Sequence, residues 1–403
     1  MNRRKLGLPV RQFLTFGLTE DPVPIATRPG DCAERGGSAV ITTSTVRRAI
    51  LPVLALVAAV LMAGPAAART DEGAAQKPGP LAGLIKTSKN ESGLVFYANA
   101  PAANLKLVTD RFQFYYPWIK TTAYDLDNNV IFSKYASEAA QGTRSADLLI
   151  SSAPNLWVYA RRQKYVIDYD PLELAQFPRF AKQYKGVFIM SPDPAVLLYN
   201  KLLLKDKVPE SVTQIANDPG TYGKLTGYTI DNLFGYTALW GYIQKKGWSS
   251  LERIGKDRFR AQTGVAGQQS LVSQGAAVTA YLTSPTVRYN LKTNPQLGAI
   301  LDWTYNKDAT PLVPRGIGIT VKAASPASAK LFLNWVYSKA GQQAMCDASF
   351  TAFRNKFVPK NCTNTLADVY AKVGQKNVIL VPFSQKFVND QPAYKKRWHD
   401  IFG

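Results

Sequence analysis

The stretch VPRGIGITVKAASPASAKLFLNWVYSKAGQQ, residues 313–343, decides the fold of this chain. Its first half is predicted to form a strand, and a helix then begins at Ser325 as N-cap with Pro326 at the first helical position. Apolar residues recur with the helical period of 3.6, which predicts a buried face. That face consists of Ala329, Phe332, Leu333, Val336 and Tyr337.

The same alternation of strand and helix extends toward the N-terminus. GLVFYA (93–98) is predicted as a buried strand, and Leu105, Val108, Thr109 and Phe112 follow it at helical spacing. SKYASEAAQGT (133–143) and SADLLISSA (145–153) predict a second helix and strand. VFIMSPDPAVLLYNKLLL (187–204) is interpreted as a crossing between lobes, and residues 225–247 as a strand and a helix capped by Asp231 or Asn232. The pattern predicts α/β sheets with ligands at the carboxyl ends of their strands.

The N-terminal region is typical of an exported protein. Residues 46–68 contain Arg47 and Arg48, an apolar run of 14 residues and a small-residue ending, so we expect a signal peptide cleaved before Arg69. A membrane anchor is the alternative, but a spanning helix needs about 20 apolar residues. Because a signal normally begins near the initiator, residues 1–45 are interpreted as lying upstream of the true start. Residues 69–92 are predicted to be a flexible leader, and the mature protein to be periplasmic.

The chain is strongly basic. Residues 1–68 hold 8 of the 49 Lys and Arg and 4 of the 28 Asp and Glu, so the mature chain carries a net charge of +17. A positive field favours an anionic ligand, although a generally basic secreted protein is the alternative. The sequence shows no nucleic-acid-binding module, and we expect no nucleic-acid partner.

Candidate catalytic residues are few. Cys346 and Cys362 are the cysteines of the mature chain, and in an exported protein they predict a disulfide rather than free thiols. His399 lies close to the C-terminus, and neither a GxxxxGK nor a GxSxG motif is present. A catalytic pair of carboxylates stays an open alternative, but the sequence favours a protein that is not an enzyme.

Several segments, taken in their order along the chain, resemble the type 2 periplasmic solute-binding proteins of ABC importers, the family that includes the ferric-iron-binding proteins. The resemblance covers Leu94 to Ser349 and rests on a first strand ending in Tyr97, GTRSADLLISS (142–152), VLLYN (196–200) before VPESVTQIAND (208–218), and residues 313–343. It implies the two-lobed periplasmic binding protein type 2 fold, a monomer whose lobes close over a solute and deliver it to an ABC permease. We expect lobe 1 to comprise residues 93–194 and 301–344, and lobe 2 residues 195–300 and 345–403. The hinge is expected at Tyr199 and Asn200.

The resemblance also guides the choice of ligand residues. Ferric-binding members often carry a histidine or acid after the first strand and an adjacent tyrosine pair in the second lobe. Here YANAP (97–101) has neither, and Tyr281 and Tyr289 are eight positions apart. We therefore expect no metal ligands and no cofactor, and a solute bound by neutral groups at strand ends and helix starts. The predicted ligand residues are Asn99, Ala100, Ser151, Ser152, Asn232, Gly267, Gln268, Thr283 and Ser284.

Alternatives stay open at this level. Ser151, Ser152 and Asn232 could simply cap helices. The solute, expected to be anionic, could be a ferric complex that carries its own chelator. The same scaffold could serve an enzyme, or the ligand-sensing subunit of a membrane kinase.

Overall fold

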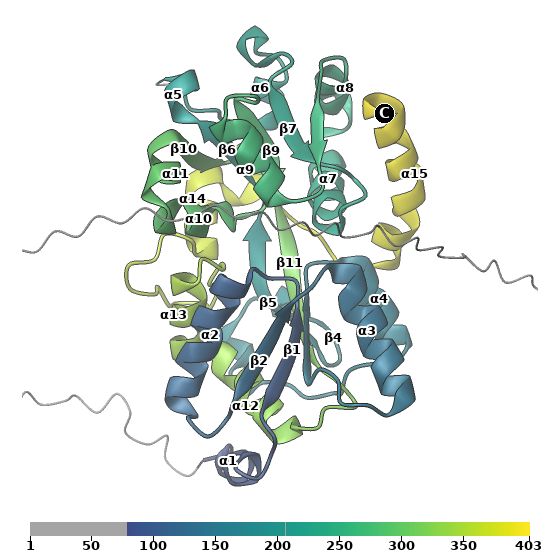
Figure 1. Ribbon diagram of the computed structural model, residues 1–403, viewed down its shortest axis with the longest axis vertical. Coiled ribbons are helices and arrows are strands. Elements are labelled where there is room, and N and C mark those ends of the chain that lie inside the picture. Colours follow the sequence, from purple (N-terminus) through teal and green to yellow (C-terminus); the bar gives the residue numbers. More distant parts are fainter. Residues whose placement is uncertain (1–78, 206) are drawn as a thin grey trace, which may run out of the picture. The chain divides into compact units, whose positions relative to one another are not determined.

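The computed structural model describes residues 79–205 and 207–403, which form two α/β lobes, each built around one sheet (Figure 1). The predicted signal peptide, the predicted upstream segment and residues 69–78 of the predicted leader lie outside the described residues. The two-lobed α/β fold expected from the sequence is confirmed.

The first lobe contains a seven-stranded sheet. Its strands run in the order β2-β1-β3-β11-β5-β4, with β12 also paired to β11. β1, β2 and β3 are parallel to one another, and β11 is antiparallel to β3 and β5. The strands are β1 (Leu94–Ala98), β2 (Thr121–Asp125), β3 (Leu148–Ser151), β4 (Lys182–Tyr184), β5 (Val187–Pro194), β11 (Thr310–Ile319) and β12 (Val378–Leu380). Its helices are α1 (Ala82–Ser88), α2 (Ala102–Tyr115), α3 (Asn128–Gln141), α4 (Pro154–Arg162), α12 (Pro326–Val336) and α13 (Lys339–Asp347).

The second lobe contains a five-stranded sheet in the order β10-β6-β9-β7-β8. β7 is parallel to β8 and β9, whereas β6 is antiparallel to β9 and β10. The strands are β6 (Val196–Asn200), β7 (Leu225–Tyr228), β8 (Arg260–Gln262), β9 (Thr279–Thr283) and β10 (Leu301–Tyr305). The helices are α5 (Lys201–Leu204), α6 (Val212–Ile215), α7 (Leu233–Lys246), α8 (Ser249–Gly255), α9 (Val265–Ser273), α10 (Val287–Thr293) and α11 (Pro295–Ile300). α14 (Leu366–Val373) contacts β10 and β12, and α15 (Gln385–Phe402) contacts α4 of the first lobe and α7 and α8 of the second.

The chain crosses from the first sheet to the second between Pro194 and Val196, within the segment where the sequence predicted a crossing. It returns between β10 and β11, and the two crossings are joined because the Ala195 amide donates to the Pro311 carbonyl at 2.9 Å. Tyr199 and Asn200, the residues expected at the hinge, lie farther along, inside the second sheet. The Asn200 side chain instead caps α5, since it accepts from two backbone amides at its start.

Two segments differ from the expected division between the lobes. Residues 301–305 form β10, which pairs with β6 of the second lobe rather than with the first-lobe sheet. Within the C-terminal segment expected in lobe 2, β12 pairs with β11 of the first-lobe sheet. Both differences arise from short strands whose pairing is long-range, and neither has a strong local signal.

The first described residues form a helix rather than a flexible leader. α1 occupies residues 82–88 of the predicted leader because Leu81, Leu84 and Ile85 pack against the first-lobe core. The residue that follows this helix by three positions, Glu91, reaches α12. Its carboxylate accepts from the backbone amides of Ala327 and Ser328 at 2.8 and 2.7 Å.

The capping of α12 therefore corrects the sequence prediction. Ser325 stands at the N-cap position with Pro326 after it, as expected, but its hydroxyl makes no capping hydrogen bond. The carboxylate of Glu91 satisfies the free amides of the first turn instead, and a negative charge is stabilising at that end of a helix. The predicted inner face of α12 is confirmed, because all five of its apolar residues are buried.

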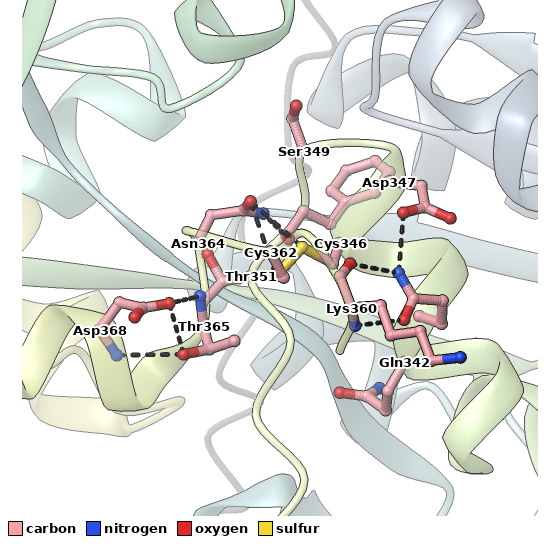
Figure 2. The surroundings of a disulfide bond; sticks show 12 residues. Gln342, Cys346, Asp347, Ser349, Thr351, Lys360, Cys362, Asn364, Thr365 and Asp368 are labelled. Carbon is pink, nitrogen blue, oxygen red and sulfur yellow. Dashed lines mark hydrogen bonds between the residues drawn. A yellow bond between two sulfur atoms is a disulfide. The ribbon is translucent and has the colours of Figure 1, made fainter. Parts of the chain in front are cut away.

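The predicted disulfide is confirmed: Cys346 at the end of α13 bonds to Cys362, with 5.9 Å between their Cα atoms (Figure 2). The Gln343 side chain holds the base of the loop, since it accepts from the Lys360 amide at 2.7 Å. The Asn364 side chain donates to the Phe350 carbonyl and ties the other end to the segment after α13. Among the helices of residues 79–205 and 207–403, none is both long and apolar enough to span a membrane.

Candidate functional site

The carboxyl ends of strands from both lobes meet at a cavity of about 180 Å³. In open α/β sheets this edge is where ligands bind, because loops and helix starts converge there. We refer to it as the cleft cavity. The residues that line it are Asn99, Ala100, Pro101, Asp125, Asp127, Asn128 and Arg315 from the first lobe, and Tyr228, Asn232, Phe234, Thr263, Gly264, Val265, Ser284 and Thr286 from the second.

The first-lobe wall is held in place by a buried hydrogen-bond network. The Ser152 hydroxyl donates to the Asn99 side-chain oxygen at 2.8 Å, and the Ser151 hydroxyl donates to that of Asn128 at 2.6 Å. Both serines are fully buried at the end of β3. They therefore orient the two asparagines, whose side chains stand at the cavity.

The second-lobe wall combines helix starts, hydroxyls and aromatic rings. The Asn232 side chain caps α7 by accepting from the Gly235 amide at 2.9 Å, and its amide group donates to the Thr263 carbonyl at 2.9 Å. The hydroxyls of Ser284 and Thr286, between β9 and α10, lie 3.0 Å apart. This wall has polar groups with remaining hydrogen-bonding capacity.

Two aromatic rings complete that wall. Tyr228 at the end of β7 and Phe234 in the first turn of α7 lie with ring centroids 5.3 Å apart. Burial raises the pKa of Tyr228, although nearby Arg315 opposes the shift. The phenol is therefore neutral at physiological pH.

Arg315 is the one cation that lines the described cleft cavity, and it is already paired. Its Nε donates to Asp193 at 2.9 Å, with both side chains almost completely buried, and its Nη1 donates to the Asn99 carbonyl. Buried ion pairs of this kind are costly to break because one charge is left uncompensated. Arg315 thus ties the crossing strands β5 and β11 to the end of β1.

Asp125 and Asp127 bring two carboxylates to the same cavity. Partial removal from water raises the pKa of Asp125, while Arg315 and the amides of Ala100 and Ala102 act in the opposite direction. Asp127 precedes α3, and within the described residues it forms neither a capping hydrogen bond nor an ion pair. The charged groups of the wall, counted with Asp193, leave a surplus of negative charge.

A second cavity, of about 380 Å³, adjoins the first and shares Asp127, Asn128, Asn232 and Thr263 with it. Asp231 also lines this space, but it is paired with Lys395 at 3.0 Å and with His399 at 3.1 Å from α15. His399 thus lies on the surface beside the cavity. The two cavities extend the space available to a solute along the boundary between the lobes.

The structure sorts the predicted ligand residues into three groups. Asn99, Ala100, Asn232 and Ser284 line the cleft cavity. Ser151 and Ser152 lie beneath it, where they support the asparagines. Thr283, Gly267 and Gln268 do not line it: Thr283 and Gln268 are fully buried, and Gly267 lies in α9 against the Gln262 side chain. Whether the four lining residues bind the solute stays a prediction.

Several lining residues were not predicted from the sequence, chief among them Asp125, Asp127, Tyr228 and Arg315. β2 has an exposed and irregular pattern, so its end at Asp125 carried no periodic signal. Its one usable signal is the segment DLDNN (125–129), which is rich in helix-capping residues before α3. Arg315 lies in a continuous buried strand, and burial of a charge is not visible in a local pattern.

The residues described provide no cluster of three or more His, Cys, Asp or Glu that could hold a metal ion. Tyr281, considered for its place near the tyrosine pair of the ferric-binding proteins, is buried against Phe259 and does not line the cavity. A different cavity, of about 620 Å³, lies beside α1 and α12, where its wall includes Leu81, Ile85 and Trp335. Its wall is largely apolar and does not include the carboxyl ends of the strands, so we do not assign it as the solute site.

The fold resembles that of several solved bacterial proteins. The substrate-binding protein of an ABC transporter from Agrobacterium tumefaciens is 20% identical, with a TM-score of 0.66 over 77% of this chain and 95% of that one. The periplasmic binding protein AfuA from Actinobacillus pleuropneumoniae, solved with fructose-6-phosphate, is 17% identical, with a TM-score of 0.62 over 77% and 98%. Iron-bound HitA from Pseudomonas aeruginosa is 17% identical, with a TM-score of 0.60 over 76% and 99%. No curated protein matches the sequence at a significant level.

These likenesses establish the fold, and the sequence itself establishes the family. The model of the bacterial extracellular solute-binding proteins matches residues 86–343, which include every strand from β1 to β11 and all the residues that line the cleft cavity. The two lobes, the crossing strands and the cavity at the strand ends agree with that match. This chain belongs to the bacterial extracellular solute-binding proteins, the family whose members bind small solutes for ABC permeases.

Proposed function

We propose that this protein is a periplasmic receptor that binds a small polar solute in the cleft cavity and delivers it to an ABC permease. The observation that carries the proposal is the convergence of strand ends from both lobes on one polar cavity. A solute there touches both lobes at once. It stabilises the closed arrangement to the extent that it binds that arrangement more tightly than the open one.

The anionic charge predicted for the solute stays a prediction, and the cleft wall weighs against it. Arg315 and the hydroxyls of Ser284 and Thr286 are donors that would suit an anion. Arg315, however, is already neutralised by Asp193, and the carboxylates of Asp125 and Asp127 would repel a negative charge. What the geometry supports best is a polar solute, and its charge follows from these carboxylates as argued below.

Three further features belong to the proposal. Export through a signal peptide at residues 46–68 would place the receptor where the solute is captured. The family is a transport component rather than an enzyme family, and we propose that the protein carries out no turnover. We also propose a monomer, because in such receptors the binding site is complete within one chain.

A steric block offers a sharp test of the site. Gly264 lines the cavity, has extended backbone, and a Cβ added there meets no atom within 4 Å. Gly264→Phe should therefore fold normally while its ring fills the space that the solute needs. Gly83→Phe is the matched control, because Gly83 lies in α1 and likewise has open space around it.

The measurement has two parts. Thermal-shift screening of a small-solute library on the periplasmic protein should find compounds that raise the melting temperature, and small-angle X-ray scattering should show a smaller radius of gyration with them. Gly264→Phe should abolish both effects and Gly83→Phe should retain them. If a solute still binds Gly264→Phe with wild-type affinity, the cleft cavity is not the site. If no compound closes the lobes, the receptor function is wrong.

A further inference from the structure

The charge of the cleft wall is opposite to the charge of the chain. The sequence carries a net charge of +21, with 49 basic and 28 acidic residues. The charged residues that line the cleft cavity are Asp125, Asp127 and Arg315, and in the adjoining cavity they are Asp127 and Asp231. Among the charged residues of these two walls the acids outnumber the single base, which favours a negative potential at the cavity.

The basic side chains near the cavity are already paired with groups of the protein. Arg315 is paired with buried Asp193 and also donates to the Asn99 carbonyl, so its charge is compensated inside the protein. Lys395 and His399 both face Asp231. This leaves Asp125 and Asp127 as carboxylates that no ion pair neutralises within the described residues.

The usual position for an anion is also occupied. The start of a helix attracts anions because its first amides are free. At the start of α2 that place is taken by the Asp125 carboxylate: partial removal from water raises its pKa, and the nearby backbone amides of Ala100 and Ala102 act to lower it. A second anion at this place would meet a carboxylate instead of free amides.

The opposite lobe contributes the complementary surface. Tyr228 and Phe234 line the same cavity, and their rings are tilted by 47° with centroids 5.3 Å apart. The face of an aromatic ring attracts a cation, more strongly where water is excluded. When the lobes close, a solute between them would have carboxylates on its first-lobe side and aromatic rings on its second-lobe side.

We propose that the solute is an organic cation, whose charged nitrogen lies between the carboxylates of Asp125 and Asp127 and the rings of Tyr228 and Phe234. This inference rests on the proposed receptor function and names the chemical class of its solute. Asn99, Asn232 and the hydroxyl pair of Ser284 and Thr286 would bind the neutral polar part.

The test separates charge from shape. Choline and its neutral isostere 3,3-dimethylbutan-1-ol, then putrescine and thiamine, are titrated calorimetrically into the periplasmic protein, with citrate and inorganic phosphate as anions. At least one of the cations should bind, and more tightly than either anion. Choline should in any case bind more tightly than its isostere, because only choline carries the charge.

Two variants test the carboxylates directly. Asp125→Asn and Asp127→Asn preserve side-chain shape, and each should weaken binding of the cation by at least about tenfold, as expected for a charged partner replaced by a neutral one. The matched control is Asp110→Asn, which removes an exposed carboxylate of α2 that pairs with Lys106 and does not line either cavity. Its affinity should equal that of the wild type.

The outcomes distinguish this inference from the receptor function. Tighter binding of an anion or a neutral solute than of every cation, or unchanged cation affinity in Asp127→Asn, overturns the organic cation. If an anion or a neutral solute closes the lobes of the wild type and Gly264→Phe abolishes this closure, the receptor function stands. If no solute closes the lobes, both the receptor function and the organic-cation inference are wrong.

Discussion

The carboxylate of Glu91 is a capping group that reaches α12 from 236 positions earlier in the chain. It accepts from the amides of Ala327 and Ser328 and from the Ser328 hydroxyl, at 2.8, 2.7 and 2.6 Å. Ser325, at the position where a local cap belongs, contributes no such bond. We therefore predict that Glu91→Ala destabilises the protein and that Ser325→Ala does not.

The magnitude follows from the bonds that are lost. Loss of an N-cap costs about 1 kcal/mol, hydrogen bonds to a charged group contribute about 1.5 to 3 kcal/mol each, and the charge at a helix start adds up to about 1 kcal/mol. Glu91 is half-buried, so water can solvate part of the freed amides. We expect Glu91→Ala to lower the free energy of unfolding by about 2 to 4 kcal/mol, and Glu91→Gln by about half as much. Ser325→Ala should change it by less than about 0.5 kcal/mol, because its buried hydroxyl has no partner among the described residues.

The assay is urea unfolding, followed by circular dichroism and tryptophan fluorescence, with the midpoints compared at equal slope. Agreement of the two probes checks that the two lobes unfold together. A Ser325→Ala variant that loses as much stability as Glu91→Ala would refute the reasoning. It would mean that the local serine caps the helix, as the sequence alone suggested.

Three further predictions follow from single contacts. Replacing Cys346 and Cys362 by serine should lower the free energy of unfolding by about 3 kcal/mol, the loop-closure entropy for their separation of 16, and an unchanged urea midpoint would contradict it. Gly341→Ala should cost about 1 to 3 kcal/mol because its Cβ would lie 1.9 Å from the Trp335 carbonyl oxygen, whereas Gly83→Ala, in open space, should cost nothing; equal melting temperatures would oppose this. Because partial removal from water raises the pKa of Asp125, the folded state disfavours its ionised form. Asp125→Asn should raise the melting temperature of the solute-free protein at pH 7, and the gain should shrink as the pH falls through the folded-state pKa and vanish below the unfolded value of about 3.9; a lower melting temperature at pH 7 would show the sign is wrong.

Much of the fold could be predicted because its signals are local. The apolar residues of the inner face of α12 recur every 3.6 residues, so in a helix they lie on one side and are buried together. The prolines that interrupt the apolar run of residues 187–204 indicated a crossing within that segment, and the structure places it between Pro194 and Val196. Two cysteines in the mature part of an exported chain allow only one disulfide, and Cys346 and Cys362 form it.

The candidate site could be predicted only in part. Asn99 follows a strand that is visible in the sequence, Asn232 was expected at a helix start, and Ser284 was expected from the family resemblance; all three line the cavity. Ser152 was expected beside them, but it is fully buried just beyond β3, where its hydroxyl donates to the Asn99 side chain. Asp125 was missed because β2 is an edge strand without a buried face.

The sequence by itself determined the α/β class, the family, the disulfide and the approximate positions of the strand ends, since each depends on neighbours within a few turns or on a motif. Only the tertiary structure decided which polar groups line the cleft cavity and which are paired inside the protein. Arg315 is neutralised by Asp193, 122 positions away, and α12 is capped by Glu91 from a distant loop. The net charge of a cavity is the sum of such pairings, and these are formed when the chain folds back on itself. For that reason a basic sequence that predicted an anionic solute folds around a cavity whose charged lining residues are two acids and one paired arginine.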